Sequence, residues 1–233
     1  MKTLIAIISC NAHATYRTAI RETWLPKVTK EKADVFFFVG RECTAAESDI
    51  VTLNCGDGYG SLPEKVQNIV RWALERGYEC LVKIDNDVVL KVNDFFSSGF
   101  ERWDFNGHTN DDRQAVTAPW GFLYTLSKRS MEIVAQAQLP PNNNDEVWVA
   151  RSLAPHGITL HHEPRYYLHR GKRQDFLSNT PRPLRAPRRD RPMDPETPKG
   201  GIAYCVFLHW AGYHATPDEV NIREYHRLFK ETQ

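Results

Sequence analysis

Two aspartates directly follow an apolar run in the stretch LVKIDNDVVL, residues 81–90. Asp85 and Asp87 lie one residue apart, and residues i and i+2 of an extended chain face the same side. With no lysine or arginine expected beside them there, the carboxylates should repel each other unless a hard divalent cation binds them, and Mg²⁺ or Mn²⁺ in such sites also holds substrate phosphates. The spacing therefore predicts a metal–diphosphate site. A solvated turn and an acid–base pair for glycoside hydrolysis are the alternatives.

The elements that must position these carboxylates are clear in the first half of the chain. Apolar runs at residues 3–10, 33–40 and 80–85 predict buried strands, and 49–53 predicts a weaker one. Residues 14–27 indicate a helix that Pro26 ends. Residues 61–78 indicate another, with a capping box made by Ser61 and Glu64 and a stop at Gly77.

The second half continues the alternation of strands and helices. Residues 113–127 predict two strands around a Pro-Trp-Gly break, 128–139 a helix, 145–157 a short helix, 201–210 a late strand and 216–232 a terminal helix. This order predicts an α/β fold, a single domain over 1–233 with a mixed, mostly parallel sheet flanked by helices. Ligands of such sheets bind outside the carboxyl ends of the strands, where Asp85 lies.

Composition sets limits on function and compartment. The 233 residues carry a formal net charge of +1 and a globular share of apolar residues, 41%. The apolar start, LIAIISC, is far shorter than the roughly 20 residues of a membrane span and lacks signal-peptide features. Five scattered cysteines without a CxxC pair favour a reducing compartment. We therefore expect a cytoplasmic protein of a microbe or a virus-infected cell.

A set of blocks, in order, resembles one enzyme family. RTAIRETW (17–24), FFFVG (36–40), GDGYGSLPEKV (56–66), LVKIDNDVVL (81–90), APWGFLYTLS (118–127), DEVWVA (145–150) and CVFLH (205–209) are similar to the β-1,3-galactosyltransferase-like glycosyltransferases, which include Fringe-type and core-1-type enzymes. The resemblance implies a GT-A (Rossmann-like) fold, a UDP-sugar donor, Mn²⁺ or Mg²⁺, and inversion at the anomeric carbon. It implies a nucleotide-sugar half, 1–110, and an acceptor half, 111–233, that holds the Arg/Pro-rich segment 165–199.

The resemblance also implies roles for individual residues. Asp85-Asn86-Asp87 takes the place of the family's three aspartates, with Asn86 as the one departure. Asp87 is then the direct metal ligand, Asp85 faces the ribose or the metal's water shell, and His209 completes the metal site. The residues implied around the donor are Arg17, Arg21, Asp57, Lys65, Lys83, Asp85, Asn86, Trp120 and Gly121.

The family's catalytic base lies in a Glu-Asp-Val string at a helix start, and this chain has Asp145-Glu146-Val147. With Val147 as the register, Glu146 takes the base position, and Asp145 is the alternative. A helix N-terminus stabilises carboxylates as anions, which opposes their strength as bases. The base would take the proton of an acceptor hydroxyl as UDP leaves from the opposite face of the sugar.

One basic segment points to an acceptor. Residues 165–191 hold nine Lys/Arg against two Asp/Glu, so the remainder is acidic. Basic residues interleaved with aromatic ones suit a phosphate backbone and an unstacked base. We therefore expect DNA with a hydroxymethylated pyrimidine, or a sugar on it, as in phage DNA modification. The alternatives are a glycan, glycolipid or polysaccharide precursor, and, from other classes, a metal-dependent nuclease or a nucleic-acid-binding module. The implied acceptor-binding residues are Tyr166, Arg170, Lys172, Arg173, Arg185, Arg188 and Arg189.

Overall fold

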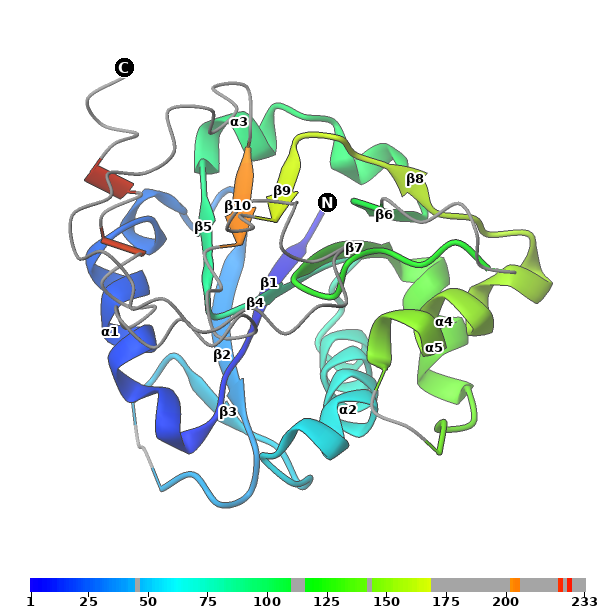
Figure 1. Cartoon of the computed structure of the whole chain (residues 1–233), viewed down its shortest axis with the longest axis horizontal. Coiled ribbons are helices and arrows are strands. Elements are labelled where there is room, and N and C mark those ends of the chain that lie inside the picture. The colour runs from blue at the N-terminus through cyan, green and yellow to red at the C-terminus, as the bar shows by residue number, and fades with distance from the viewer. Residues whose placement is uncertain are drawn as a thin grey trace, which may run out of the picture.

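The computed structural model describes residues 1–44, 47–109, 116–141, 144–168, 202–205, 222–223 and 226–227. A seven-stranded sheet in the order β3-β2-β1-β4-β7-β6-β8 forms the centre (Figure 1). Its strands are β1 (Thr3–Ile8), β2 (Asp34–Val39), β3 (Ile50–Thr52), β4 (Cys80–Asp85), β6 (Phe105–Gly107), β7 (Leu123–Ser127) and β8 (His161–His162). All strands of this sheet run in one direction except β7. The expected single α/β domain with a mixed, mostly parallel sheet is confirmed.

A second, three-stranded sheet in the order β5-β10-β9 packs beside the first. It consists of β5 (Val88–Leu90), β9 (Tyr166–Leu168) and β10 (Ala203–Cys205). The helices are α1 (Ala14–Glu22), α2 (Leu62–Glu75), α3 (Val92–Phe96), α4 (Lys128–Gln136) and α5 (Asp145–Leu153). Short 3₁₀ turns are η1 (Asn11–His13), η2 (Leu25–Lys27), η3 (Tyr59–Ser61), η4 (Phe100–Arg102) and η5 (Ala154–His156).

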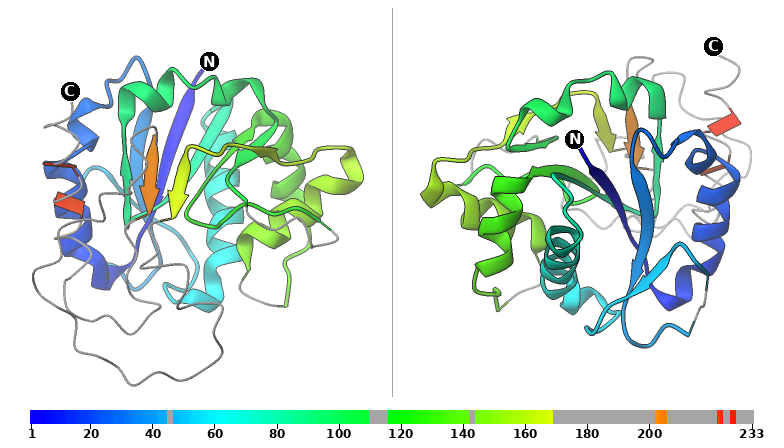
Figure 2. Two further views of the ribbon diagram at one scale, coloured as in Figure 1. Left: turned by 45° about the horizontal axis from the view of Figure 1, so that its top comes forward. Right: turned by 180° about the vertical axis from the view of Figure 1, so that it is seen from behind.

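The main sheet is buried on both faces, which explains the unbroken apolar runs of its central strands. In β1, Ile5 and Ile7 pack into a core with α1 and the small sheet, whereas Leu4 and Ala6 pack into a core with α2, α4 and α5. The two views in Figure 2 show α1 and the α2, α4 and α5 group on opposite sides of the central strands. Alternate side chains of one strand therefore join two separate cores.

The antiparallel strand β7 brings the loop before it to the edge of the sheet where the parallel strands end. The carboxyl ends of β1, β2, β4, β6 and β8 lie at one edge, and β7 begins there because it runs antiparallel to β4 and β6. The loop before β7 is fixed at this edge, since the Asp85 amide donates to the Phe122 carbonyl at 2.9 Å and the Trp120 amide to the His108 carbonyl at 2.7 Å. Residues from both halves of the sequence thus meet beyond the end of β4.

Several local predictions need correction. The first helix ends at Glu22 rather than at Pro26, which lies in the 3₁₀ turn η2. Ser61 precedes α2 without a side-chain capping bond, because the residues before it form η3, so the capping-box prediction is wrong. Gly77 does end α2, with a positive φ of 71°. Among the described part of 113–127 only the strand after the Pro-Trp-Gly break forms.

No helix within the described ranges combines the length and the apolar character that crossing a lipid bilayer requires. The predicted strand at 201–210 is seen as β10 over Ala203–Cys205, and residues 206–210 lie outside the described residues.

Candidate active site

The two aspartates lie where the sequence pattern places them, at the carboxyl end of β4. Asp85 and Asp87 are each partly exposed, whereas the intervening Asn86 is buried. The Asn86 amide nitrogen lies 3.3 Å from Ser9 Oγ and 2.9 Å from His13 Nδ1, so it ties the end of β4 to the residues after β1. Asn86 thus has a positioning role in this structure, and its predicted donor contact remains a prediction.

The prediction that no cation lies beside the aspartates is wrong. Lys83 Nζ is 2.6 Å from Asp85 Oδ1 and also donates to the Gly121 carbonyl. Lys83 precedes Asp85 by two residues and therefore faces the same side of β4. Its side chain is only 2% exposed, against 34% for Asp85. Burial alone would lower the pKa of Lys83, but the charges of Asp85 and Asp145 outweigh it and raise that pKa, so Lys83 stays a cation.

The two carboxylates at the start of α5 have different surroundings. Asp145 is buried, accepts a 2.9 Å hydrogen bond from the Tyr124 hydroxyl and lies 3.8 Å from Lys83 Nζ. Burial, followed by the charge of Asp145, raises the pKa of Tyr124 well above its usual value, so Tyr124 remains a donor. Glu146 is the more accessible of the two. These contacts favour Asp145 as a structural anion and Glu146 as the group that can meet a substrate.

Glu146 has the pKa of a competent base at neutral pH. Burial and the neighbouring Asp145 charge raise the pKa of Glu146 to about 7. Its carboxylate lies against Gly121, where an added Cβ would be 3.2 Å from Glu146 Oε2. The loop before β7 therefore holds both Glu146, through Gly121, and Lys83, through the Gly121 carbonyl.

Replacing Gly121 by alanine should displace the Glu146 carboxylate by a few tenths of an ångström without unfolding the protein. We expect Gly121→Ala to lower the transfer rate about tenfold, since small misplacements of a reacting group are costly. Gly58→Ala is the matched control, because a Cβ at Gly58 meets nothing within 4 Å. Steady-state transfer rates and thermal unfolding of both variants check this, and an unchanged rate in Gly121→Ala would contradict the contact with Glu146.

Asp57 joins three segments at the other end of the edge. It accepts hydrogen bonds from the backbone amides of Asn11 and Gly40, at 2.5 and 2.6 Å, and from Lys65 Nζ at 2.7 Å. Burial opposes ionisation of Asp57, but these bonds prevail and its pKa is lowered. Lys65 is buried and also donates to the Ser9 carbonyl at 2.8 Å. This pair is a structural hub in the described conformation, and the predicted donor contacts of Asp57 and Lys65 remain predictions.

The two arginines of α1 have different environments. Arg17 is buried and donates to the Cys10 carbonyl at 2.6 Å, beside the ends of β1 and β4, and its buried Nε has no hydrogen-bond partner among the described residues. Arg21, at the other end of α1, forms a bidentate pair with Asp49 at 2.6 and 2.8 Å. The contacts place Arg17 beside the strand ends and pair Arg21 with Asp49, and the predicted donor contacts of both arginines remain predictions.

The predicted acceptor residues are not brought together by the described structure. Tyr166 is fully buried and packs against Phe95, so it is not available to stack on an acceptor base, because β9 carries it into the core under the small sheet. Arg170, Lys172, Arg173, Arg185, Arg188 and Arg189 lie outside the described residues, as does the predicted metal ligand His209. Within the described part of the chain, no three His, Cys, Asp or Glu side chains form a ready metal cluster.

The residues present nevertheless suit a divalent cation with a diphosphate. Asp85 and Asp87 are both partly exposed at this strand end, although Asp87 Oδ1 is buried, and the Asn86 amide nitrogen is held by Ser9. Mg²⁺ in nucleotide sites is held by one or two carboxylates, with phosphate oxygens and water completing its coordination. The donor set therefore fits such an ion with bound substrate, with Lys83 offsetting part of the negative charge of Asp85.

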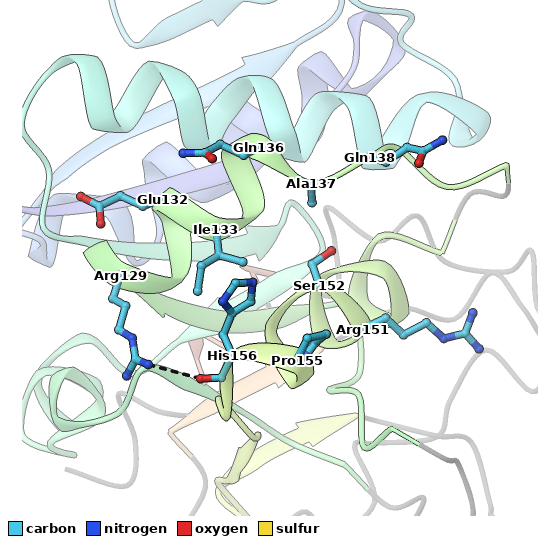
Figure 3. Close-up of a pocket in the computed structure, with 10 residues that line it drawn as sticks. All are labelled: Arg129, Glu132, Ile133, Gln136, Ala137, Gln138, Arg151, Ser152, Pro155 and His156. Carbon is cyan, nitrogen blue, oxygen red and sulfur yellow. Dashed lines mark hydrogen bonds between the residues drawn. The ribbon is translucent and has the colours of Figure 1, made fainter.

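A surface cavity of about 570 Å³ lies between α4 and α5, away from this site (Figure 3). Its lining includes Arg129, Glu132, Arg151 and His156. Arg129 and Glu132 belong to α4, Arg151 lies near the end of α5 opposite Glu146, and His156 ends η5. None of the predicted site residues lines this cavity.

Sequence patterns did not single out three features of the site. Tyr124 looked like one more residue of a buried strand, and its hydroxyl partner Asp145 is 21 positions away. His108 follows β6 and His162 is the last residue of β8, two short strands that have no clear alternation. Tyr59, in the GDGYG loop, is 73% exposed. Only the aspartate-rich strand end carried a local signal.

One protein-family model matches part of the sequence. The galactosyltransferase family model matches residues 15–111, which run from α1 past β6 and include Arg17, Lys83, Asp85 and Asp87. The match supports a glycosyltransferase. Asp145 and Glu146 lie beyond the matched residues. No curated protein matches the sequence at a significant level.

One solved structure that aligns with this chain is that of a protein from Desulfovibrio desulfuricans G20, assigned as a nucleotide-diphospho-sugar transferase. It shares 11% sequence identity with a TM-score of 0.45, and the alignment covers 70% of this chain and 80% of that one.

Proposed function

We propose that the protein is an inverting, metal-dependent glycosyltransferase that moves a sugar from a UDP-sugar to an acceptor hydroxyl. The observation that carries the proposal is the arrangement at one sheet edge. Two partly exposed carboxylates lie at the end of β4 (Asp85) and in the turn after it (Asp87), and a separate carboxylate with a pKa of about 7, Glu146, lies against Gly121 in the loop before β7. The match of residues 15–111 to the galactosyltransferase family supports the same activity.

Asp85 and Asp87 would hold the cation, and Arg17 lies near enough to the strand ends to add positive charge beside the diphosphate. A bound Mn²⁺ or Mg²⁺ would supply charge stabilisation to the departing diphosphate. Lys83 holds Asp85 at 2.6 Å and lies 3.8 Å from Asp145, and it is too deeply buried to contact the substrate itself. The carboxyl ends of β1, β2 and β4 would thus form the donor side of the site.

The chemical step needs one base. Glu146 takes the proton of the acceptor hydroxyl while the hydroxyl oxygen forms a bond to the anomeric carbon. The bond from that carbon to the diphosphate oxygen breaks, and UDP leaves with the electron pair. Attack from the face opposite the leaving group inverts the anomeric centre. Trp120 and Gly121, next to Glu146, would shape the pocket for the transferred sugar.

Two classes of acceptor molecule are proposed. Modified DNA is proposed on the basic segment 165–191, and a glycan, glycolipid or polysaccharide precursor is the alternative. A metal-dependent nuclease would use the same aspartates without a need for UDP.

The test of the proposed activity is UDP release from a panel of UDP-sugars with Mn²⁺. We expect release that requires the metal and falls at least 100-fold in Asp87→Ala, since the site would lose a metal ligand. Asp94→Ala, in α3, is the control for a nearby aspartate outside the site. Calorimetry should show Mn²⁺-dependent UDP binding. Absence of both binding and release would refute the proposed activity and favour the nuclease or a binding module.

A further inference from the structure

Tyr124 is a fully buried titratable residue of the site that the proposed chemistry has not used. It lies in β7 directly opposite Lys83 of β4 in the antiparallel pair of strands. Residues that face each other across two paired strands point to the same side of a sheet, and Lys83 Nζ lies 5.4 Å from the centre of the Tyr124 ring. We call these two residues the Lys83–Tyr124 pair. It brings one hydroxyl and one ammonium group from two central strands to the same place.

Both members of the pair approach one oxygen atom of Asp145, the first residue of α5. The Tyr124 hydroxyl donates to Asp145 Oδ2 at 2.9 Å, and Lys83 Nζ lies 3.8 Å from the same atom. The Asp145 side chain is 3% exposed, so water cannot readily take the place of the hydroxyl. The Tyr124 ring is itself held by an edge contact with Phe105, with ring centroids 6.1 Å apart. The start of α5 is therefore attached to the centre of the sheet.

Asp145 is the neighbour that acts most strongly on Glu146. Burial is the first cause that raises the pKa of Glu146 to about 7, the charge of Asp145 is the second, and a hydrogen bond to Asp145 favours the protonated form further. The Glu146 backbone amide and the charge of Lys83 act in the opposite direction. The other titratable groups around Glu146 are Tyr124 from β7 and Tyr59 from η3, with Asp85 beside Lys83. The ease with which Glu146 loses its proton therefore depends on the negative charge that Asp145 presents to it.

The Tyr124 hydroxyl reduces the charge that Asp145 presents. A hydrogen-bond donor on a carboxylate stabilises the anionic form of that carboxylate and offsets part of its charge. Lys83 Nζ, at 3.8 Å, is too far from Asp145 for a hydrogen bond, so Tyr124 is the close donor on that oxygen within the described residues. Without the hydroxyl, the proton of Glu146 would become the nearest donor for Asp145. Its removal would then leave two poorly compensated anions side by side, which makes the proton harder to remove.

We propose that Tyr124 is a positioning residue of the transfer reaction, whose hydroxyl fixes Asp145, offsets part of its charge and so allows Glu146 to take the acceptor proton at neutral pH. Lys83 assists through its own charge. This inference rests on the proposed function, because it concerns the base of that reaction. Tyr124 contacts no substrate, since it is fully buried. It acts on Glu146 through Asp145.

Tyr124→Phe tests the proposal because it removes the hydroxyl and keeps the ring. We expect the pH midpoint of kcat/KM, measured at one constant Mn²⁺ concentration, to rise by about one pH unit, the effect of losing one hydrogen bond to an ionised carboxylate. Transfer at pH 7 should then fall about fivefold, whereas the rate above about pH 9 should return to the wild-type value. A purely structural role of Tyr124 would lower the rate equally at every pH.

Asp145→Asn should move the same midpoint in the opposite direction. The asparagine keeps the shape of the side chain and can still accept from Tyr124, but it removes the charge beside Glu146, so the midpoint should fall by about one pH unit. Tyr78→Phe is the matched control, because it removes a 2.8 Å hydrogen bond between a buried tyrosine and Asp34, at the start of β2 and so at the opposite edge of the sheet. It should leave the midpoint at the wild-type value.

Carboxyl ¹³C NMR gives a readout that does not need catalysis. The Glu146 signal, assigned by its loss in Glu146→Gln, should titrate about one pH unit higher in Tyr124→Phe and about one pH unit lower in Asp145→Asn than in wild type. An unmoved NMR midpoint in either variant, folded as shown by thermal unfolding, would overturn the role of Tyr124 and leave the transferase intact. Failure of wild-type protein to bind UDP with Mn²⁺, with the NMR midpoints moved as expected, would instead overturn the proposed activity but not the coupling of Tyr124 to Glu146.

Discussion

Glu146→Gln should lower the rate of sugar transfer by about 10² to 10⁴-fold, the usual contribution of a general base. The substitution keeps the shape of the side chain and removes the proton acceptor. Binding of UDP with Mn²⁺ should be unchanged, because Asp85 and Asp87 are not altered. Single-turnover transfer with matched UDP titrations measures both. A Glu146→Gln enzyme with the full rate would show that another group takes the proton.

The pH dependence of kcat/KM provides a second, independent test of Glu146 as the base. Because the pKa of Glu146 is raised to about 7, it is largely protonated below pH 6, and the kcat/KM of wild type should rise with pH and level off above about pH 7 to 8. The residual activity of Glu146→Gln should lack this rise. Glu132→Gln, on the exposed surface of α4, should keep the wild-type profile.

As the pH rises, the contribution of Glu146 to the free energy of unfolding should fall, whereas the activity should rise. A carboxyl whose pKa is higher in the folded protein than the usual 4.5 favours folding below pH 4.5, and this contribution is lost as the pH rises through about 7. Above that pH the buried Glu146 anion destabilises the fold. Glu146→Gln should therefore raise the free energy of unfolding at pH 8 by about 1–3 kcal/mol, as denaturant titration would show. A large loss of stability instead would mean that lost activity reflects misfolding.

Lys83→Met should be the most destabilising single change in the site, at about 3 kcal/mol, the cost of leaving buried charge without its partner. The methionine fills the space of the lysine stem, so the loss reports charge and hydrogen bonding more than a cavity. Asp145, 3% exposed and 3.8 Å from Lys83 Nζ, would keep its hydrogen bond from Tyr124 but lose the cation beside it. Urea unfolding at pH 7 measures the effect.

Two comparisons separate this explanation from general disruption of the core. The deficit of Lys83→Met should shrink as the pH falls toward 4, where carboxylates without a cation become protonated. Adding Asp145→Asn to Lys83→Met should restore part of the stability, since the unpaired anion is gone. If the double variant is as unstable as the sum of the two single ones, the Lys83–Asp145 coupling is absent.

The central strands and the strand-end aspartates could be predicted because their signals are local. The run CLVKID is apolar on both sides of the strand and ends in acids, and β4 is found over Cys80–Asp85 as expected. The role of Lys83 was missed although it is only two residues away, because an apolar run gives no sign of which side is open. Alternation places Lys83 and Asp85 together, and the structure shows 2.6 Å between them.

The remaining site depends on long-range pairing. Which of Asp145 and Glu146 faces substrate is decided by Tyr124, which reaches Asp145 from β7, and by Gly121, which lies against Glu146. The placement of His108 beside His162 depends on the register of β6 with β8, two strands of three and two residues that carry no periodic pattern. Tyr166 is an aromatic residue in a basic segment, which suggested that it stacks on a ligand, but its position in β9 buries it.

Asp57 gives the donor side of the edge a particular dynamic character. Its carboxylate holds the amides that follow β1 and β2 and the ammonium of Lys65 from α2. Each of these loops alone would fray independently, but one shared acceptor makes their opening a single event. We therefore expect the segments that Asp57 holds to open together rather than one at a time.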